Sequence, residues 1–572
     1  MRPAHQCLPV AACALAEEAG RRGEADPWDT VTWADKSLRW HCRVRAEPPA
    51  TADIECKMPP FFTTLCSRLL VGRAIIATMR KRLRIVVYGN AIVVVIVAIY
   101  FLVMPTGVLV QALNDPGLHT GEVPHFAFRW HRSLSRRFGP WARSRVASGR
   151  ATQLTKSNVS GTEWPLFSSV FYLWATEGLQ DAWEKDPSLA RVMPKQYARE
   201  AIEAVTILVA DPNHATWVKA QWGDDYLQHE NLFYRMLLIS GLTSYQKLVG
   251  DNAYQALLSD QVETLASEID KSPFGLLDDY PGSCYPVDVL PAIAAIRKAD
   301  DVLGTDHAVF ASRALRAFEG ARLDPETGLP AYVAGSKTGV GLGSARGVGL
   351  SFMLIWAAEL WPETAQQWYV QYKEQFWQEG WLLAGFREFP RKYPMPNWRL
   401  FDVDAGPVLA GYGTAASAFG IGAARANGDF EHAYPLSAQA LVASWPLPDG
   451  RLLGPRLLSN FSDAPYIGES ALLFSLTRQP TVNSIATAGS LPLSVYLALG
   501  VYGVIALAWL GVAAARVIRW EKAFSHKHYL ALRWQLNIWP ILIGIGTVAL
   551  MMSWEMIGGL LLFSAQFLPL SK

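Results

Sequence analysis

The chain has 572 residues, of which 51% are apolar and 18% are charged. Its 52 Lys and Arg residues nearly balance its 50 Asp and Glu residues; the net charge of +2 excludes a nucleic-acid protein that binds by bulk charge. Twenty-two Trp residues indicate a folded protein with membrane segments, and six Cys residues are too few for a disulfide scaffold.

Residues 1–78 show no clear periodicity. They mix charges and Pro with five of the six Cys residues, and no apolar run of a signal peptide stands near the start. Met79, followed by Arg-Lys-Arg-Leu-Arg, is a more ordinary beginning for a protein. We therefore expect 1–78 to be a disordered tail or a mis-annotated extension.

Two apolar segments are long enough to cross a membrane. Residues 85–104 contain no charge and match the roughly 20 residues that a spanning helix needs. Residues 491–515 are the second candidate. Basic residues precede the first segment and follow the second, which places both of those flanks in the cytoplasm. We expect one transmembrane helix within 79–110 and the others within 491–572.

A third apolar stretch, residues 538–570, is interrupted by Glu555. It is too long for one straight span, so we expect a span at about 538–556 and then an interfacial or re-entrant segment. A single tilted helix is the alternative. In either case residues 111–490 lie outside the cytoplasm, which in a bacterial inner membrane means the periplasm.

The region outside the membrane has helical periodicity. Apolar residues recur at i, i+3 and i+4 in at least nine segments joined by short Gly, Pro and Asp connections. About twelve helices fit into this region, enough for six helix pairs. We expect an all-α fold, an (α/α)6 barrel flanked by transmembrane helices; an irregular helical bundle is the alternative.

The segment Gln228-His-Glu-Asn-Leu-Phe-Tyr234 resembles the linalool dehydratase/isomerase family. The resemblance continues through 245–250 and Ser272-Pro-Phe-Gly-Leu276, and it covers about 160 residues. It implies an (α/α)6 barrel with its site at the mouth and metal-free lyase or isomerase chemistry on a hydroxylated substrate.

The catalytic residues of that family carry over unevenly. His229 corresponds to the family's active-site His. The two catalytic Cys residues fall at about Asp278 and Asp288, and the loop between them contains only Cys284. The chain therefore resembles a membrane-anchored relative that lacks the catalytic Cys pair.

Several groups of residues suit acid/base chemistry. We expect His229 on a helix with Asp225 on the same face, where the carboxylate would orient the imidazole. Glu230 stands between Tyr226 and Tyr234 at helical spacing, and apolar walls would raise its pKa. A partly exposed His and a structural, hydrogen-bonded Glu are the simpler interpretations.

The loops supply further candidates. Asp278 and Asp279 precede Tyr280 and Tyr285, and Asp288 is either a catalytic acid or a helix N-cap. Asp402 and Asp404 fall on one side of an extended segment before a helix, with N-capping as the alternative. Arg346 lies in a Gly-rich loop without a Walker lysine, and Arg387 is either a substrate contact or a surface salt bridge.

The candidate catalytic residues are His229, Glu230, Asp278, Asp279, Asp288 and Asp404. The candidate substrate-binding residues are Asp225, Tyr226, Tyr234, Tyr280, Tyr285, Arg346, Arg387 and Asp402. No HExxH or CxxC spacing occurs, so we expect neither a metal nor a cofactor. The expected partners are a small-molecule or glycan substrate and the lipid bilayer, without nucleic acid; the oligomeric state stays open.

Two rival functions remain at this level. One is a glycan hydrolase or lyase with paired carboxylates, and the other is a non-catalytic membrane-bound scaffold. Because the inner helices of an (α/α)6 barrel start at the same rim, we expect the carboxylates and His229 to line one aromatic-walled pocket there.

Overall fold

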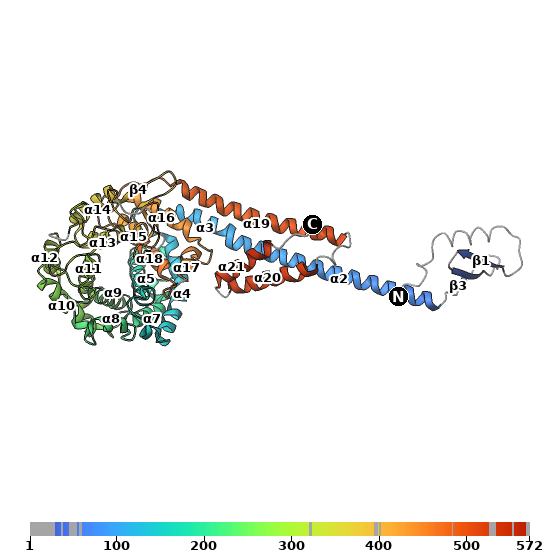
Figure 1. Ribbon diagram of the computed structural model, residues 1–572, viewed down its shortest axis with the longest axis horizontal. Coiled ribbons are helices and arrows are strands. Elements are labelled where there is room, and N and C mark those ends of the chain that lie inside the picture. Colours follow the sequence, from blue (N-terminus) through green and yellow to red (C-terminus); the bar gives the residue numbers. More distant parts are fainter. Residues whose placement is uncertain are drawn as a thin grey trace. The chain divides into compact units, whose positions relative to one another are not determined.

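The computed structural model describes residues 29–35, 38–44, 54–56, 60–319, 323–393, 398–399, 402–460, 462–482, 484–525, 533–551 and 554–567. These residues are mostly helical, which confirms the all-α character (Figure 1). The chain forms two compact units, Met1–Gly89 with Trp520–Leu536, and Asn90–Arg519 with Asn537–Lys572.

The first unit contains a small antiparallel sheet in the order β1-β2-β3. Its strands are Asp29–Asp35, Leu38–Val44 and Ile54–Cys56. Helix α2 begins at Pro60 and runs to Ala98, so Met79 lies inside a helix rather than at an element boundary. The rest of the expected 1–78 tail lies outside the described residues. Within this unit Glu521 pairs with Arg84 at 2.9 Å and accepts a hydrogen bond from Tyr88 at 3.0 Å.

Two helical segments are long and apolar enough to cross a membrane, Lys81–Leu113 and Leu493–Lys522. The first joins α2 through the π-helical turn Ile99–Val103 to α3, Met104–Leu113. The second lies within α19, Leu493–Ser525. Both agree with the expected segments, since each window of 18 residues carries at most two charges.

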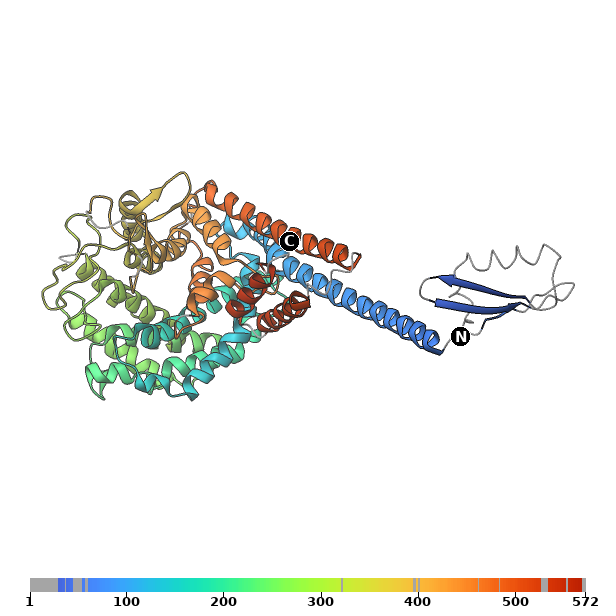
Figure 2. The ribbon, with the colours of Figure 1, turned by 45° about the vertical axis from the view of Figure 1, so that its right-hand side comes forward.

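The third apolar stretch forms a pair of helices, α20 (Arg533–Met551) and α21 (Glu555–Phe567). They lie side by side in dark red in Figures 1 and 2. A Cβ built on Gly558 would lie 2.8 Å from the carbonyl oxygen of Gly546, so the two backbones touch where neither residue has a side chain. The break after Met551 comes earlier than the expected position near 556.

Six helices of the second unit pack into a closed ring: α5 on α9, α9 on α11, α11 on α13, α13 on α15, α15 on α18, and α18 back on α5. Other helices pack outside them, α7 on α5 and α9, α10 on α9 and α11, α14 on α13, and α16 on α15 (Figure 1). Rings of Phe171, Trp174, Phe352, Trp356 and Phe474 meet between α5, α13 and α18.

The bounds of these elements are α4 His125–Ala147, α5 Val159–Lys185, α6 Pro194–Tyr197, α7 Arg199–Ala210, α8 Thr216–Trp222, α9 Leu232–Val249, α10 Gln255–Lys271, α11 Pro286–Leu303, α12 Ala308–Phe318, α13 Gly347–Leu360, α14 Pro362–Phe376, α15 Thr414–Ala426, α16 Phe430–Ser444, α17 Leu453–Ser459 and α18 Ile467–Leu476. Two hairpins complete the unit, β4 (Trp377–Glu379) with β5 (Ala384–Phe386), and β6 (Val408–Leu409) with β7 (Tyr412–Gly413).

A buried histidine makes the stability of this unit sensitive to acid. The His131 ring lies 2.9 Å from the Tyr197 hydroxyl and 2.7 Å from the Thr176 hydroxyl, and it stacks on Tyr172. Burial lowers the pKa of His131 to about 3, whereas an unfolded chain binds this proton at about pH 6.5. The neutral ring therefore contributes stability that is complete above pH 6.5 and is lost as the pH falls.

We expect the buried His131 to lower the free energy of unfolding by about 1.4 kcal/mol for each pH unit below pH 6.5. The raised pKa values of Glu163 and Glu388, both about 7, act in the opposite direction. The measurement is therefore the thermal midpoint from pH 7 to pH 5, compared between the natural chain and His131→Gln. An equal pH dependence of the two proteins would contradict the prediction.

Candidate functional site

Four carboxyl groups gather where helices of the ring begin. Glu163 lies near the start of α5, Asp288 in the first turn of α11, Asp279 in the loop before α11, and Asp404 in the loop before α15. The negative charges of Glu163 and Asp404 both act on Asp288, and that of Asp288 acts on Asp279. Asp279, Asp288 and Asp404 were among the expected site residues, and Glu163 was not.

Tyrosine rings line this acidic cluster of Glu163, Asp279, Asp288 and Asp404. The Tyr280 hydroxyl donates a short hydrogen bond to Glu163, and the Tyr332 hydroxyl donates to Asp404 at 2.8 Å. Tyr285 packs edge-on against Tyr332 with ring centroids 5.7 Å apart. Burial raises the pKa of Tyr285, and all four carboxylates add to that shift.

Glu163 is a carboxyl group of the cluster whose pKa is raised to near neutral pH. Burial, and to a lesser extent the charge of Asp404, raises its pKa to about 7 although Tyr280 favours the ionised form. Asp288 also has a raised pKa because of desolvation and the charges of Glu163 and Asp404. Like charges this close do not all ionise, so the cluster holds an acid and a base at the same pH.

Asp279 is tied to the backbone. It is only 1% exposed, and its Oδ2 accepts the amide of Tyr285 at 2.7 Å. The amide of Phe233, in the first turn of α9, also favours its ionised form, whereas burial and Asp288 raise its pKa. Asp279 therefore positions the loop beside Asp288, while Glu163, Asp288 and Asp404 keep partly exposed surface.

Arg346 anchors one wall of the cluster. Its Nε donates to Glu388 at 2.7 Å, and its two Nη atoms lie 3.0 Å from Asp402 and 3.7 Å from Asp404. The guanidinium also lies over the ring of Tyr332 at 4.7 Å. Burial raises the pKa of Glu388 to about 7, and Arg346 opposes this shift. Arg346 thus holds Asp404 and Tyr332 in place.

Glu230, Asp278 and His229 contact neighbouring groups of the chain, and His229 has the Asp225 partner that the sequence predicted. Glu230 accepts the amide of Asp278 at 2.6 Å and pairs with Lys337 at 2.6 Å. The Asp278 carboxylate accepts the amide of Gly282 at 2.8 Å. His229 contacts Asp225 at 3.2 Å and stacks on Trp222. The carboxylates of Glu230 and Asp278 therefore both accept hydrogen bonds from backbone amides of the loop.

The expected helix at His229 is wrong. Residues Tyr226–Gln228 form a 3-10 turn, His229 is extended, and α9 begins only at Leu232. Asn231 has a φ of 32°, a left-handed conformation that Asn tolerates and that interrupts a helix. His229 and Asp225 still meet, although they share a turn and not a helix face.

Tyr226, Tyr234 and Arg387, which were expected to contact a substrate, make contacts within the protein. The rings of Tyr226 and Tyr234 pack edge-on at 5.6 Å in the core, and Tyr234 is 2% exposed. Arg387 bonds to the side chain of Gln378 and to the carbonyl of Phe389, so it braces the β4–β5 hairpin. Gly411, with a φ of 88°, leaves the space that its guanidinium occupies.

Glu163 and Tyr332 were not foreseen. An acidic residue at a helix start is ordinarily explained by the helix dipole, and nothing local marks Glu163 as different. Its partner Tyr280 is 117 residues away in the sequence. Cys284, in the loop where the resembled family has its thiols, is 1% exposed, and its carbonyl accepts the amide of Ala334.

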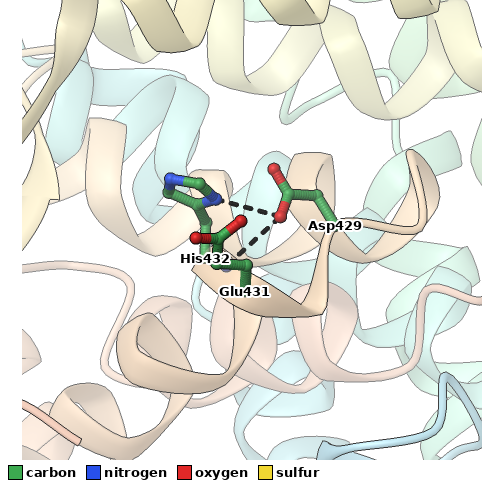
Figure 3. Close-up of side chains that lie close together, drawn as sticks. All are labelled: Asp429, Glu431 and His432. Carbon is green, nitrogen blue, oxygen red and sulfur yellow. Dashed lines mark hydrogen bonds and ion pairs between the residues drawn. The ribbon is translucent and has the colours of Figure 1, made fainter. Parts of the chain in front are cut away.

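A second cluster, Asp429, Glu431 and His432, has the geometry of a possible metal site (Figure 3). Asp429 accepts hydrogen bonds from the His432 ring at 2.9 Å and from its amide at 3.3 Å, and Lys373 lies 2.7 Å from its other oxygen. Burial opposes ionisation, yet His432 and Lys373 lower the pKa of Asp429 to about 2. Because Asp429 already has a cation and caps α16, these contacts explain the cluster without a metal.

Comparison with known proteins adds no assignment to this geometry: no protein-family model matches the chain, and a search of curated proteins also found no match.

Proposed function

We propose that the chain is a membrane-anchored (α/α)6-barrel enzyme, similar to linalool dehydratase/isomerase, that performs acid/base chemistry on an uncharged, hydroxylated substrate. The closed ring of six helices with further helices outside it supports the barrel. The observation that carries the chemistry is the group of Glu163, Asp288 and Asp404, in which Tyr280 donates to Glu163 and Tyr332 donates to Asp404. Burial raises the pKa of Glu163 in this group to about 7.

In this proposal Glu163 is the general acid. Its proton passes to a substrate hydroxyl, the C–O bond breaks, and water leaves. Asp288 or Asp404 removes a proton from the neighbouring carbon, and the electron pair of that C–H bond forms the new double bond. The base then carries the proton that Glu163 has lost, so proton exchange among the carboxyls restores the starting state.

The cluster favours a neutral substrate for an electrostatic reason. Together with Glu388 and Asp402, the acidic cluster brings six carboxyl groups to the candidate site. Arg346 is already paired with three of them. An anionic substrate would be repelled by the unpaired carboxylates. The tyrosine rings offer apolar faces for the remaining contacts.

Glycan cleavage is the second candidate, because the same tyrosine rings suit stacking on sugar faces beside paired carboxyls. The two candidates differ in their products. Purified full-length protein, incubated separately with a tertiary isoprenoid alcohol and with soluble oligosaccharides, would release an alkene and water in the first case and reducing ends in the second. The absence of turnover on both classes would favour the non-catalytic scaffold.

We further propose that the ring domain lies on the non-cytoplasmic side, the periplasm of a bacterial cell. Basic residues flank the inner ends of both candidate spans, as the positive-inside rule requires. A reporter inserted at Lys337, which is 77% exposed, is expected to be accessible from outside intact cells. If the site is labelled only when the reagent can enter the cytoplasm, the proposed non-cytoplasmic orientation of the ring domain is wrong.

A further inference from the structure

The turn between β4 and β5 exposes large apolar side chains. Trp381 is 80% exposed and Leu383 is 40% exposed. The turn is nevertheless held in place: the Tyr412 hydroxyl donates to the carbonyl of Leu383 at 2.9 Å, and the Gln439 side chain donates to that of Ala384 at 2.6 Å. A fixed turn that presents Trp outward is a feature of interaction surfaces rather than of a core.

This turn lies where the second candidate span begins. The amide of Ser494, the second residue of α19, donates to the carbonyl of Leu382 at 3.0 Å. Trp381 and Leu383 flank that bonded residue. Trp is enriched at membrane–water interfaces, where its ring lies among headgroups and apolar chains.

A second exposed apolar residue is next to the membrane helices. Leu458, on α17, is 79% exposed, and α17 packs on α21. Nearby in the sequence, the indole of Trp445 donates to the carbonyl of Phe101 at 2.7 Å and packs edge-on against Tyr502. Phe101 and Tyr502 belong to the two candidate spans, so this side of the domain adjoins the membrane segments.

We propose that Trp381, Leu383 and Leu458 enter the interfacial layer of the same bilayer that the two spans cross. The occupant of this surface is lipid, because the surface is continuous with helices whose own exposed faces are apolar. The inference rests on the proposed membrane insertion of α19. Strand β5 runs from this turn to Arg387 and Glu388, so lipid contact would also orient the wall that holds Arg346.

The test uses spin labels on the full chain in lipid nanodiscs, with Cys7, Cys13, Cys42, Cys56 and Cys66 replaced by Ser. Single labels are introduced by Trp381→Cys and Leu458→Cys. Leu342→Cys is the aqueous control, since Leu342 is 67% exposed on the Gly-rich loop, and Leu507→Cys is the lipid control, since Leu507 is 71% exposed within α19. Collision rates with oxygen and with a water-soluble nickel chelate give the depth of each label.

We expect the labels at 381 and 458 to collide several-fold less often with the nickel chelate than the label at 342, and to lie at a depth between those at 342 and 507. Labels at 381 and 458 that match 342, while 507 reports lipid, would overturn the interfacial insertion and leave the span intact. An aqueous label at 507 would overturn the membrane insertion of α19 and the inference with it.

Discussion

Replacement of Glu163 by Gln is expected to lower kcat/KM by about 10²- to 10⁴-fold, the usual contribution of a general acid. The amide preserves the size of the side chain but cannot release a proton. The Tyr280 hydroxyl still finds an oxygen acceptor in Gln, so the fold is retained. Turnover of the substrate class identified for the natural protein, together with a thermal unfolding curve, measures both effects.

The pH dependence gives an independent check. Because the pKa of Glu163 is about 7, kcat/KM is expected to fall about tenfold per pH unit above that value as the acid ionises. Glu230→Gln is the matched control, since Glu230 is a partly exposed Glu bound to Lys337 and to the amide of Asp278. An equal loss of activity in Glu163→Gln and Glu230→Gln, or no loss in either, would contradict the assignment of Glu163.

Replacement of Arg425 by Met is expected to lower the free energy of unfolding by about 3 kcal/mol. Arg425 is fully buried near the end of α15 and donates to the carbonyls of Gly117 at 3.0 Å, Glu122 at 2.7 Å and Arg478 at 2.9 Å. Met fills a similar length but donates no hydrogen bond. The three carbonyl groups then have no hydrogen-bond donor. Each unsatisfied carbonyl destabilises the folded state by about 1–3 kcal/mol.

The opposing contribution is the cost of burying the charge. Burial, with a smaller effect of Arg478, lowers the pKa of Arg425 to about 9, so removal of the guanidinium relieves some desolvation. We expect the lost hydrogen bonds to dominate because the loop 117–122 joins the end of α3 to α4. Thermal unfolding of the detergent-solubilised protein measures the change, with exposed Arg316→Met on α12 as the control. A midpoint no lower than that of the control would show that desolvation dominates.

Local signals in the sequence determined the positions of most helices. Apolar periodicity located the helices of the ring and the two membrane segments, because these patterns depend on neighbours within a few residues. Pro286 at the first turn marked the start of α11, where it lacks an amide that a helix start leaves unpaired. The same reasoning failed at His229, because the left-handed conformation of Asn231 depends on the packing of the loop before α9.

The candidate site was only partly predictable. Asp279, Asp288 and Asp404 were recognised because each precedes or begins a helix, and helices that start at one rim bring such residues together. His229 and Glu230 were grouped with them; His229 contacts Asp225, as predicted, whereas Glu230 contacts Lys337.

Only the tertiary structure decided that Glu163 belongs to the cluster and that burial raises its pKa to about 7. The pKa of a carboxyl group depends on its burial and on nearby charges, and the charge that acts on Glu163 comes from Asp404, in a loop far away in the sequence. The sequence specifies which groups are ionisable; the fold specifies which of them lie close enough to share a proton.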